Sequence, residues 1–317
     1  MFPTRGLLRV DNQPHIVMDI TTIESILNTF ENDQTLEIET SLIRRLSVID
    51  LIDFAEGHSR AYSPHTDYTA IDQRLADFKK KLIAINTRVF DRLRTQIREG
   101  GVTPDALRRE FNRYTDYSAD QKGVNHVGPD ALDALFDGIL ELEPYPRYTP
   151  APNPDMIPYY PTPARAILDM VDNAGLKSDD VFYDLGSGAG RVVILVNLAS
   201  GSKAKGVEFN PDLHRYACGY AGKLGLTNVE FINADAQKVD YSDGTAFFMY
   251  TPFTGELMQA VLRQLWQTAQ KHPIKVCAFG PCTSTLADQS WLSSDAENVY
   301  NANAITIFFS LPRNGTE

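Results

Sequence analysis

The spacing of apolar residues divides the chain into a helical first part and a mixed second part. In residues 1–142, apolar side chains recur at steps of three and four, a spacing that lines one face of a helix. The longest such series covers residues 71–97, and shorter series cover 16–30 and 36–54. No strand-like alternation of any length occurs here. We therefore predict an all-α N-terminal domain over residues 1–143, whose apolar stripes form a core and which holds no visible catalytic constellation.

The segment over residues 144–163 is rich in proline and tyrosine. It holds eight of the chain's 18 prolines, so it cannot form a helix and favours an extended conformation. Its tyrosines are too numerous for a free tether; they are Tyr145, Tyr148, Tyr159 and Tyr160. We predict a connecting segment that lies against the surface of the protein.

Over residues 164–317, helical patterns alternate with short apolar runs, which is typical of a parallel α/β sheet. Strands are predicted at 181–185, 203–208, 229–233, 245–250 and 274–279, with helices between them at 191–199, 211–224 and 255–271. The final stretch ENVYNANAITIFFS, residues 297–310, indicates two strands about a short polar turn. It predicts an antiparallel hairpin that closes a sheet of seven strands.

The first predicted strand leads into a turn with three alternate glycines, DLGSGAG at residues 184–190. Such a turn allows the backbone to come close to a ligand, because glycine has no side chain. The spacing is GxGxG, whereas a dinucleotide fold uses GxGxxG and a P-loop requires GxxxxGK[ST]. Asp184 at the end of the strand would repel a pyrophosphate and suits a cationic ligand. S-adenosylmethionine has this character, since it carries an ammonium and a sulfonium group and no phosphate.

With these residues the chain resembles the class I S-adenosylmethionine-dependent methyltransferases, over roughly residues 158–311. The resemblance rests on four motifs in the family's order at the ends of predicted strands: DLGSGAG, GVEFN, NADAQ and YTPF. It implies S-adenosylmethionine as cofactor, with Glu208 accepting hydrogen bonds from both ribose hydroxyls and Asp235 binding the adenine amino group. The cofactor-binding residues so implied are Tyr160, Thr162, Asp184, Gly186, Ser187, Gly188, Gly190, Glu208, Phe209, Asn210, Asp235, Ala236 and Tyr250.

Taken singly, these residues have simpler explanations. Glu208 is equally well a surface acid, Asp235 fits ordinary turn chemistry, and Phe253 fits a core aromatic. The three glycines could form a tight turn and nothing more. The occurrence of all four motifs together favours the cofactor site.

Within this class, YYPTPARAILDMV, VFYDLGSGAGRVV and GVEFNPDL look most like the non-SET protein-lysine methyltransferases, which include the nucleosome-core histone type. There, the segment before the first strand covers the methionine end of the cofactor. The resemblance implies that Tyr160 and Thr162 contact the cofactor. For the transfer itself, we expect Tyr250 and Tyr159 to orient the nucleophile and Phe253 to provide an apolar wall. However, MYTPFTGE departs from the asparagine-rich segment of the histone enzymes and matches the [DN]PP[YF] of planar-nitrogen methyltransferases only in part. Both substrate assignments therefore stay open.

Composition limits the partners of the protein. The 30 basic residues stand against 41 acidic ones, a net charge of −11, and the excess is spread over both halves. This balance argues against a nucleic-acid surface. Three cysteines without a CxxC pair or histidine cluster suggest neither a disulfide framework nor a metal site. The N-terminus lacks a signal-peptide pattern and no apolar run approaches the ~20 residues of a membrane span, so we expect a cytoplasmic protein without membrane contact.

The sequence thus predicts an α/β protein with a Rossmann-like class I methyltransferase sheet behind an all-α domain. Its expected activity is methyl transfer by in-line displacement to an acceptor. The acceptor is a protein lysine in one hypothesis and a small metabolite in another. In a third hypothesis, the chain binds the cofactor without catalysis and the helical domain mediates assembly.

Overall fold

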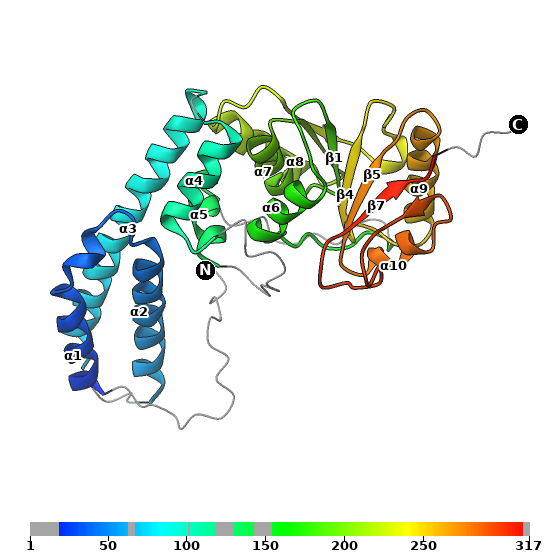
Figure 1. The fold of residues 1–317 in the computed structure, drawn as a ribbon. Helices are drawn as coiled ribbons and strands as arrows, with labels where there is room; N and C mark the ends of the chain where they lie inside the picture. Colours follow the sequence, from blue (N-terminus) through cyan, green and yellow to red (C-terminus); the bar gives the residue numbers. More distant parts are fainter. Residues whose placement is uncertain (1–18, 63–66, 101, 118–129, 143–153, 313–317) are drawn as a thin grey trace, which may run out of the picture.

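The computed structural model describes residues 19–62, 67–100, 102–117, 130–142 and 154–312. Helices α1, α2 and most of α3 project from a helix-covered sheet, with α4 and α5 lying between them and the sheet (Figure 1). No helix within the described ranges is long and apolar enough to cross a membrane.

The first part of the chain is helical, as predicted. Its helices are α1 (Ile20–Glu31), α2 (Leu42–Tyr62), α3 (Thr69–Arg98), α4 (Pro104–Tyr114) and α5 (Ala131–Leu140). The helix predicted at 36–54 is wrong at its start, because residues 34–37 form a separate 3-10 turn. Buried Arg45 of α2 donates hydrogen bonds to the carbonyl oxygens of Leu36 and Ile38. These bonds satisfy carbonyls that a continuous helix would have used itself.

The second part holds the predicted seven-stranded sheet, in the order β3-β2-β1-β4-β5-β7-β6. Its strands are β1 (Val181–Leu185), β2 (Lys203–Glu208), β3 (Val229–Asn233), β4 (Ala246–Tyr250), β5 (Lys275–Phe279), β6 (Leu292–Ser293) and β7 (Thr306–Ser310). The first five strands pair in parallel, and β7 is antiparallel to both β5 and β6. The α/β class and the terminal antiparallel pair are therefore confirmed.

The terminal hairpin differs from the prediction in one respect. Both of its strands are predicted within residues 297–310, whereas β6 lies earlier, at Leu292–Ser293. The asparagines of the connecting loop explain this difference. The side-chain oxygen of Asn298 accepts from the amide of Tyr300, and that of Asn301 accepts from the amide of Asn303. Such Asx turns supply the backbone with local partners and keep it out of a ladder.

Helices cover both faces of the sheet because each strand sends alternate side chains to opposite faces. Phe182 and Phe248 share one core with α6 (Ala164–Asn173), α7 (Arg191–Ser200) and α8 (Pro211–Lys223). Tyr183 and Phe247 belong to the opposite core, with α9 (Gly255–Ala269) and α10 (Cys282–Ala287).

The helical part and the sheet share the first of these cores. Leu135 of α5 and Phe111 of α4 belong to the same buried cluster as Ile167 of α6 and Val193 of α7. By contrast, α1, α2 and the first half of α3 enclose a core of their own. The domain boundary at residue 143 stays a prediction, but α4 and α5 pack as a layer over α6 and α7.

The strand order reverses between β1 and β4, since the chain runs outward through β2 and β3 on one side and through β5 on the other. In open α/β sheets, ligands bind at the carboxyl ends of the strands beside such a switch point. The predicted motifs at the ends of β1, β2 and β4 are therefore brought to one place.

Candidate functional site

A cavity of about 450 Å³ opens at this switch point. Its volume lies within the ~300–1,000 Å³ of small-molecule sites. Most of the residues predicted from the sequence line it: Tyr159, Tyr160, Thr162, Asp184, Gly186, Ser187, Glu208, Phe209, Asn210, Asp235, Ala236, Tyr250 and Phe253. Gly188 and Gly190 are not among its lining residues.

The three glycines of the turn make room for protein side chains. All have positive φ, at 83° for Gly186, 54° for Gly188 and 82° for Gly190. A Cβ atom would lie 2.3 Å from Pro252 at the first position, 2.0 Å from the Tyr159 ring at the second, and 2.5 Å from Phe231 at the third. The turn is thus required by its packing, and the close neighbour of Gly188 is Tyr159.

Glu208, at the end of β2, fastens this turn to the neighbouring strand. One carboxylate oxygen accepts from the amide of Gly188 and the other from the amide of Asn210, both at 2.7 Å. Burial raises the pKa of Glu208, and these amide hydrogen bonds oppose the shift by stabilising the carboxylate. This role at the turn was not predicted. Each oxygen keeps a further acceptor site for a ligand hydroxyl.

Asp184 is the most deeply buried acid of the cavity, with 3% of its surface exposed. Its carboxylate accepts no hydrogen bond from the residues that the structure describes. Burial raises the pKa of Asp184 well above its ordinary value, and the nearby charge of Glu208 raises it further. Both effects disfavour the charged form of the Asp184 side chain. A cation bound beside Asp184 would remove that penalty.

The charges around the cavity disfavour the binding of a phosphate. Its described acids are Asp184, Glu208, Asp212 and Asp235, and Arg191 is the one basic side chain among its described lining residues. The guanidinium of Arg191 is already paired with Asp133 and Asp137. No group of three or more histidine, cysteine or acidic residues in the described ranges is arranged to hold a metal ion.

Two of the predicted contacts have structural roles of their own. The carboxylate of Asp235 accepts from the amide of Gln237 at 3.0 Å, which caps a short 3-10 turn. The side chain of Asn210 accepts from the amide of Asp212 at 2.8 Å and caps α8. These bonds fix the orientation of both side chains at the rim of the cavity. Their contact with a ligand stays a prediction.

Residues 155–164, which we call the strap, run along the cavity and confirm that the end of the connecting segment lies against the protein. At one end, Met156 pairs with Phe253, and the amide of Ile157 donates to the carbonyl of Pro252 at 3.0 Å. At the other end, the carbonyl of Thr162 accepts from Nε of Arg191 at 3.0 Å. Residues 144–153 of the segment, with Tyr145 and Tyr148, lie outside the described ranges.

Aromatic rings form the outer rim beside β4. Tyr250 packs at 4.5 Å between ring centroids against Phe279 and edge-on at 6.3 Å against Tyr160. Tyr160 is 65% exposed, so this rim faces the solvent. Burial raises the pKa of the Tyr250 hydroxyl. Phe253 lines the cavity but is only 4% exposed and belongs to the core under α9, so it is both wall and core.

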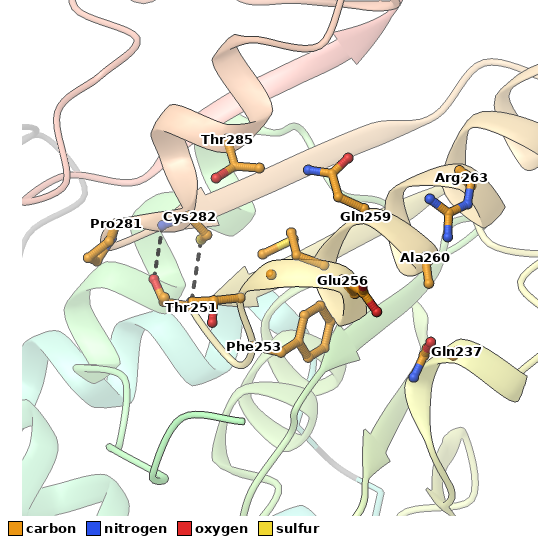
Figure 2. A pocket seen from close by; sticks show the side chains of 13 residues that line it. Gln237, Thr251, Phe253, Glu256, Gln259, Ala260, Arg263, Pro281, Cys282 and Thr285 are labelled. Carbon is orange, nitrogen blue, oxygen red and sulfur yellow. Dashed lines mark hydrogen bonds between the residues drawn. The ribbon is translucent and has the colours of Figure 1, made fainter. Parts of the chain in front are cut away.

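A second, shallower hollow of about 860 Å³ lies on the other side of the turn after β4 (Figure 2). The two hollows share Thr251 and Phe253. Thr251 has a φ of 42°, a left-handed conformation that is rare outside glycine. Cys282 holds it there, because the amide of Cys282 donates to Oγ1 of Thr251 at 3.1 Å and the amide of Thr251 donates to the Cys282 sulfur at 3.3 Å. Polar side chains surround this hollow, among them Glu256, Gln259 and Arg263 (Figure 2).

Two charged residues that support the site, Asp133 and Arg191, were not predicted from the sequence. Arg191 is the only charged residue of α7, RVVILVNLAS, and Asp133 is one of two acids in the mostly apolar α5, ALDALFDGIL. A charge within an apolar helical run indicates a buried partner. That signal was present, but the partner could not be identified from the sequence.

The part of the chain that forms this site is similar in sequence to known methyltransferases. Residues 159–249 match the family model described as histone methylation protein DOT1. A curated protein-lysine N-methyltransferase from Saccharolobus islandicus (strain REY15A) is 34% identical over 96 residues, which are 30% of this chain and 60% of that protein. The match therefore spans less than two thirds of that relative.

Two solved structures are also similar. An RNA methyltransferase from Salinibacter ruber in complex with S-adenosyl-L-homocysteine is 26% identical, with a TM-score of 0.39, over 50% of this chain and 100% of that chain. A SAM-dependent methyltransferase from Aquifex aeolicus is 18% identical, with a TM-score of 0.37, over 47% of this chain and 93% of that chain. With TM-scores this low, neither structural similarity supports an inference about the function of this protein.

The family-model match covers the glycine turn, Glu208 and Asp235, and the sheet has the topology expected from the sequence. Over these residues, the α/β part is therefore similar to the class I S-adenosylmethionine-dependent methyltransferases.

The packing at Gly188 gives the first prediction. Gly188→Ala should lower the free energy of unfolding by about 1–2 kcal/mol, the cost of a left-handed alanine, and more if the Tyr159 ring cannot move. Gly219→Ala is the matched control, because Gly219 lies in α8 with nothing within 4 Å of its Cβ position. That variant should gain roughly 0.5–1 kcal/mol. Urea unfolding of both variants measures the difference, and equal effects at the two positions would contradict the packing role.

Proposed function

We propose that the protein is an S-adenosylmethionine-dependent methyltransferase that methylates an amine, with a protein lysine as its acceptor. The observation that carries this proposal is the pair of buried carboxylates, Asp184 and Glu208, in a cavity at the switch point of the sheet. Such a cavity favours a cationic nucleoside without phosphate over ATP or a dinucleotide.

The lining residues offer a partner for each part of this cofactor. Glu208 would accept hydrogen bonds from the ribose hydroxyls through its remaining lone pairs. Asp184 would lie opposite the ammonium group, where a positive charge offsets the cost of its burial. Asp235 at the rim would accept from the adenine amino group. Tyr159, Tyr160 and Thr162 of the strap would cover the methionine end.

When bound, S-adenosylmethionine supplies a methyl group that is already activated by its sulfonium. The protein then has to hold the acceptor in line with the methyl–sulfur bond and exclude water. The aromatic rim of Tyr250, Tyr160 and Phe279 suits this task, since ring faces attract an ammonium group and its methylene chain. The amine must lose a proton, for example to water, before it attacks, and the hydroxyl of Tyr250 would then orient the neutral amine.

A protein acceptor has two further supports. The second hollow lies directly beside the cavity, where it offers polar contacts to residues that flank the target side chain. The curated relative is named as a protein-lysine N-methyltransferase.

Transfer of a tritiated methyl group from S-adenosylmethionine into fractions of a cell lysate tests this proposal. We expect label in acid-precipitated protein, released as methyllysine on hydrolysis. Glu208→Ala should lose it, because about 1–3 kcal/mol of cofactor affinity goes with the unpaired groups. Label in small molecules alone would replace the lysine with a metabolite, and no label in any fraction would contradict catalysis.

The raised pKa of Asp184 predicts a pH dependence of cofactor binding. The ligand's ammonium stabilises the carboxylate, so binding releases a proton at pH values between the pKa of Asp184 in the complex and its raised pKa in the unliganded protein. Affinity for S-adenosylmethionine should therefore rise with pH, until the ligand's amino group itself loses its proton near pH ~8.

Calorimetry over a pH series, in two buffers with different ionisation enthalpies, measures this proton release. Asp184→Asn should bind more weakly and without the rise. An affinity for the unmodified protein that stays constant or falls as the pH increases over this range would contradict the role of Asp184.

A further inference from the structure

Asp133 of α5 connects the helical part of the chain to the cavity. It is 4% exposed. Its Oδ1 accepts a hydrogen bond from the amide of Ala164 at 2.8 Å and also pairs with the guanidinium of Arg191. Its Oδ2 accepts from the amide of Asp130 at 3.1 Å, which closes a capping box at the start of α5.

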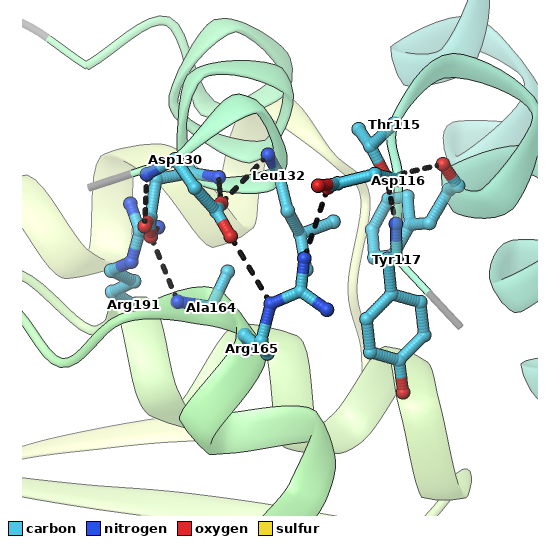
Figure 3. A network of polar contacts seen from close by, with 10 residues as sticks. Thr115, Asp116, Tyr117, Asp130, Leu132, Ala164, Arg165 and Arg191 are labelled. Atoms are coloured by element: carbon cyan, nitrogen blue, oxygen red, sulfur yellow. Dashed lines mark hydrogen bonds and ion pairs between the residues drawn. The ribbon is translucent and has the colours of Figure 1, made fainter. Parts of the chain in front are cut away.

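Arg191 carries this connection onward to the strap. It is the first residue of α7, directly after the glycine turn, and 3% of it is exposed. Its Nε donates to the carbonyl of Thr162 at 3.0 Å, while its two terminal nitrogens pair with Asp133 and Asp137. Arg191 lies beside Ala164, the first residue of α6 (Figure 3). The planar guanidinium fork allows one side chain to bind three groups in fixed directions.

These bonds fasten one end of the strap, since the Thr162 carbonyl and the Ala164 amide are both held by this pair. The other end is fastened independently by the pairing of Met156 with Phe253. Between the two ends, Tyr159 lies on Gly188 and Tyr160 lies against Tyr250. The position of both tyrosines at the cavity therefore depends on two anchors, one of which belongs to α5.

A buried ion pair is a poor source of stability alone, because desolvation offsets most of its attraction, and an apolar pair of similar volume often stabilises as much. An apolar pair at positions 133 and 191 could fill the space between α5 and α7. It could not bind the Thr162 carbonyl or the Ala164 amide.

We propose that Asp133 is a positioning residue for the cofactor site. Together with Arg191 it holds the strap in the closed position over the cavity, so that α5 of the helical part completes a site whose other walls belong to the sheet. This inference rests on the proposed function, because the strap matters only if a ligand binds beneath it.

Asp133→Asn in the full chain tests the inference, with calorimetric binding of S-adenosylhomocysteine as the first measurement. Asparagine removes the charge that pairs with Arg191 but keeps the size of the side chain. If the closed strap becomes populated in only about a tenth of the molecules, the apparent Kd should rise about tenfold. Hydrogen exchange of the peptide spanning residues 155–164 is the second measurement, and it should become faster in the unliganded variant.

Asp172→Asn is the matched control. Arg108 of α4 binds Asp172 of α6 through two hydrogen bonds, at 2.6 and 3.1 Å, so this pair also joins the helical part to the α/β part. Neither residue lines the cavity or contacts the strap. This variant should lose thermal stability and leave both the Kd and the exchange of the strap unchanged.

The outcomes separate the two proposals. Binding by the unmodified protein, with a higher Kd and faster strap exchange in Asp133→Asn alone, supports the inference. Equal binding by Asp133→Asn and the unmodified protein, or equal losses in Asp133→Asn and Asp172→Asn, would overturn it. Absence of binding in the unmodified protein would instead overturn the proposed function.

If Asp133→Asn does not fold, Asp137→Asn takes its place. Asp137 pairs with the same guanidinium from one turn further along α5 and is more exposed, with 24% of its side chain accessible. It should give a smaller shift of the Kd in the same direction, again with faster exchange in the strap. An unchanged Kd in a folded Asp137→Asn variant would overturn the inference.

Discussion

Two buried carboxylates at the carboxyl ends of β1 and β2 determine the character of this protein's cavity. Among the described residues, Asp184 has no hydrogen-bond donor and Glu208 has only backbone amides, so no unpaired lysine or arginine of the described cavity lining neutralises either charge. Arg191, the one basic side chain in the described lining of the cavity, already binds α5 and the strap. Burying two acids without a counter-charge is costly. A ligand that supplies positive charge offsets that cost, and a phosphate would increase it.

The helical part of the chain supports this cavity indirectly, through helices α6 and α7, on which it packs. Its α4 and α5 share a core with α6 and α7, and Asp133 reaches through that layer to the residue that follows the glycine turn. The strap is then held between an anchor from the helices and an anchor from the turn after β4. The same short segment covers the cavity and carries Tyr160 to the aromatic rim. The cavity and its aromatic rim are thus connected through one piece of backbone.

The fold was largely predictable because its strands are short apolar runs with polar flanks, and β1, β2 and β3 lie where the pattern placed them. The start of α2 and the position of β6 were not predictable. They depend on Arg45 satisfying distant carbonyls and on asparagine turns competing with a ladder. The predicted residues at the ends of β1, β2 and β4 do line one cavity, because the order of the strands in the sheet brings these ends together. The pairing of Asp133 with Arg191, like the seat of Tyr159 on Gly188, depends on side-chain packing between distant segments, which no local pattern encodes.

The most direct test of this account is calorimetric titration of the full chain with S-adenosylmethionine and, under the same conditions, with ATP and NADH. All three share an adenosine group, so a difference between them reports on the charge of the remainder. The account predicts saturable binding of S-adenosylmethionine and no measurable binding of the two phosphate-bearing nucleotides. Binding of ATP or NADH with equal or higher affinity would show that the buried carboxylates do not select for a cation.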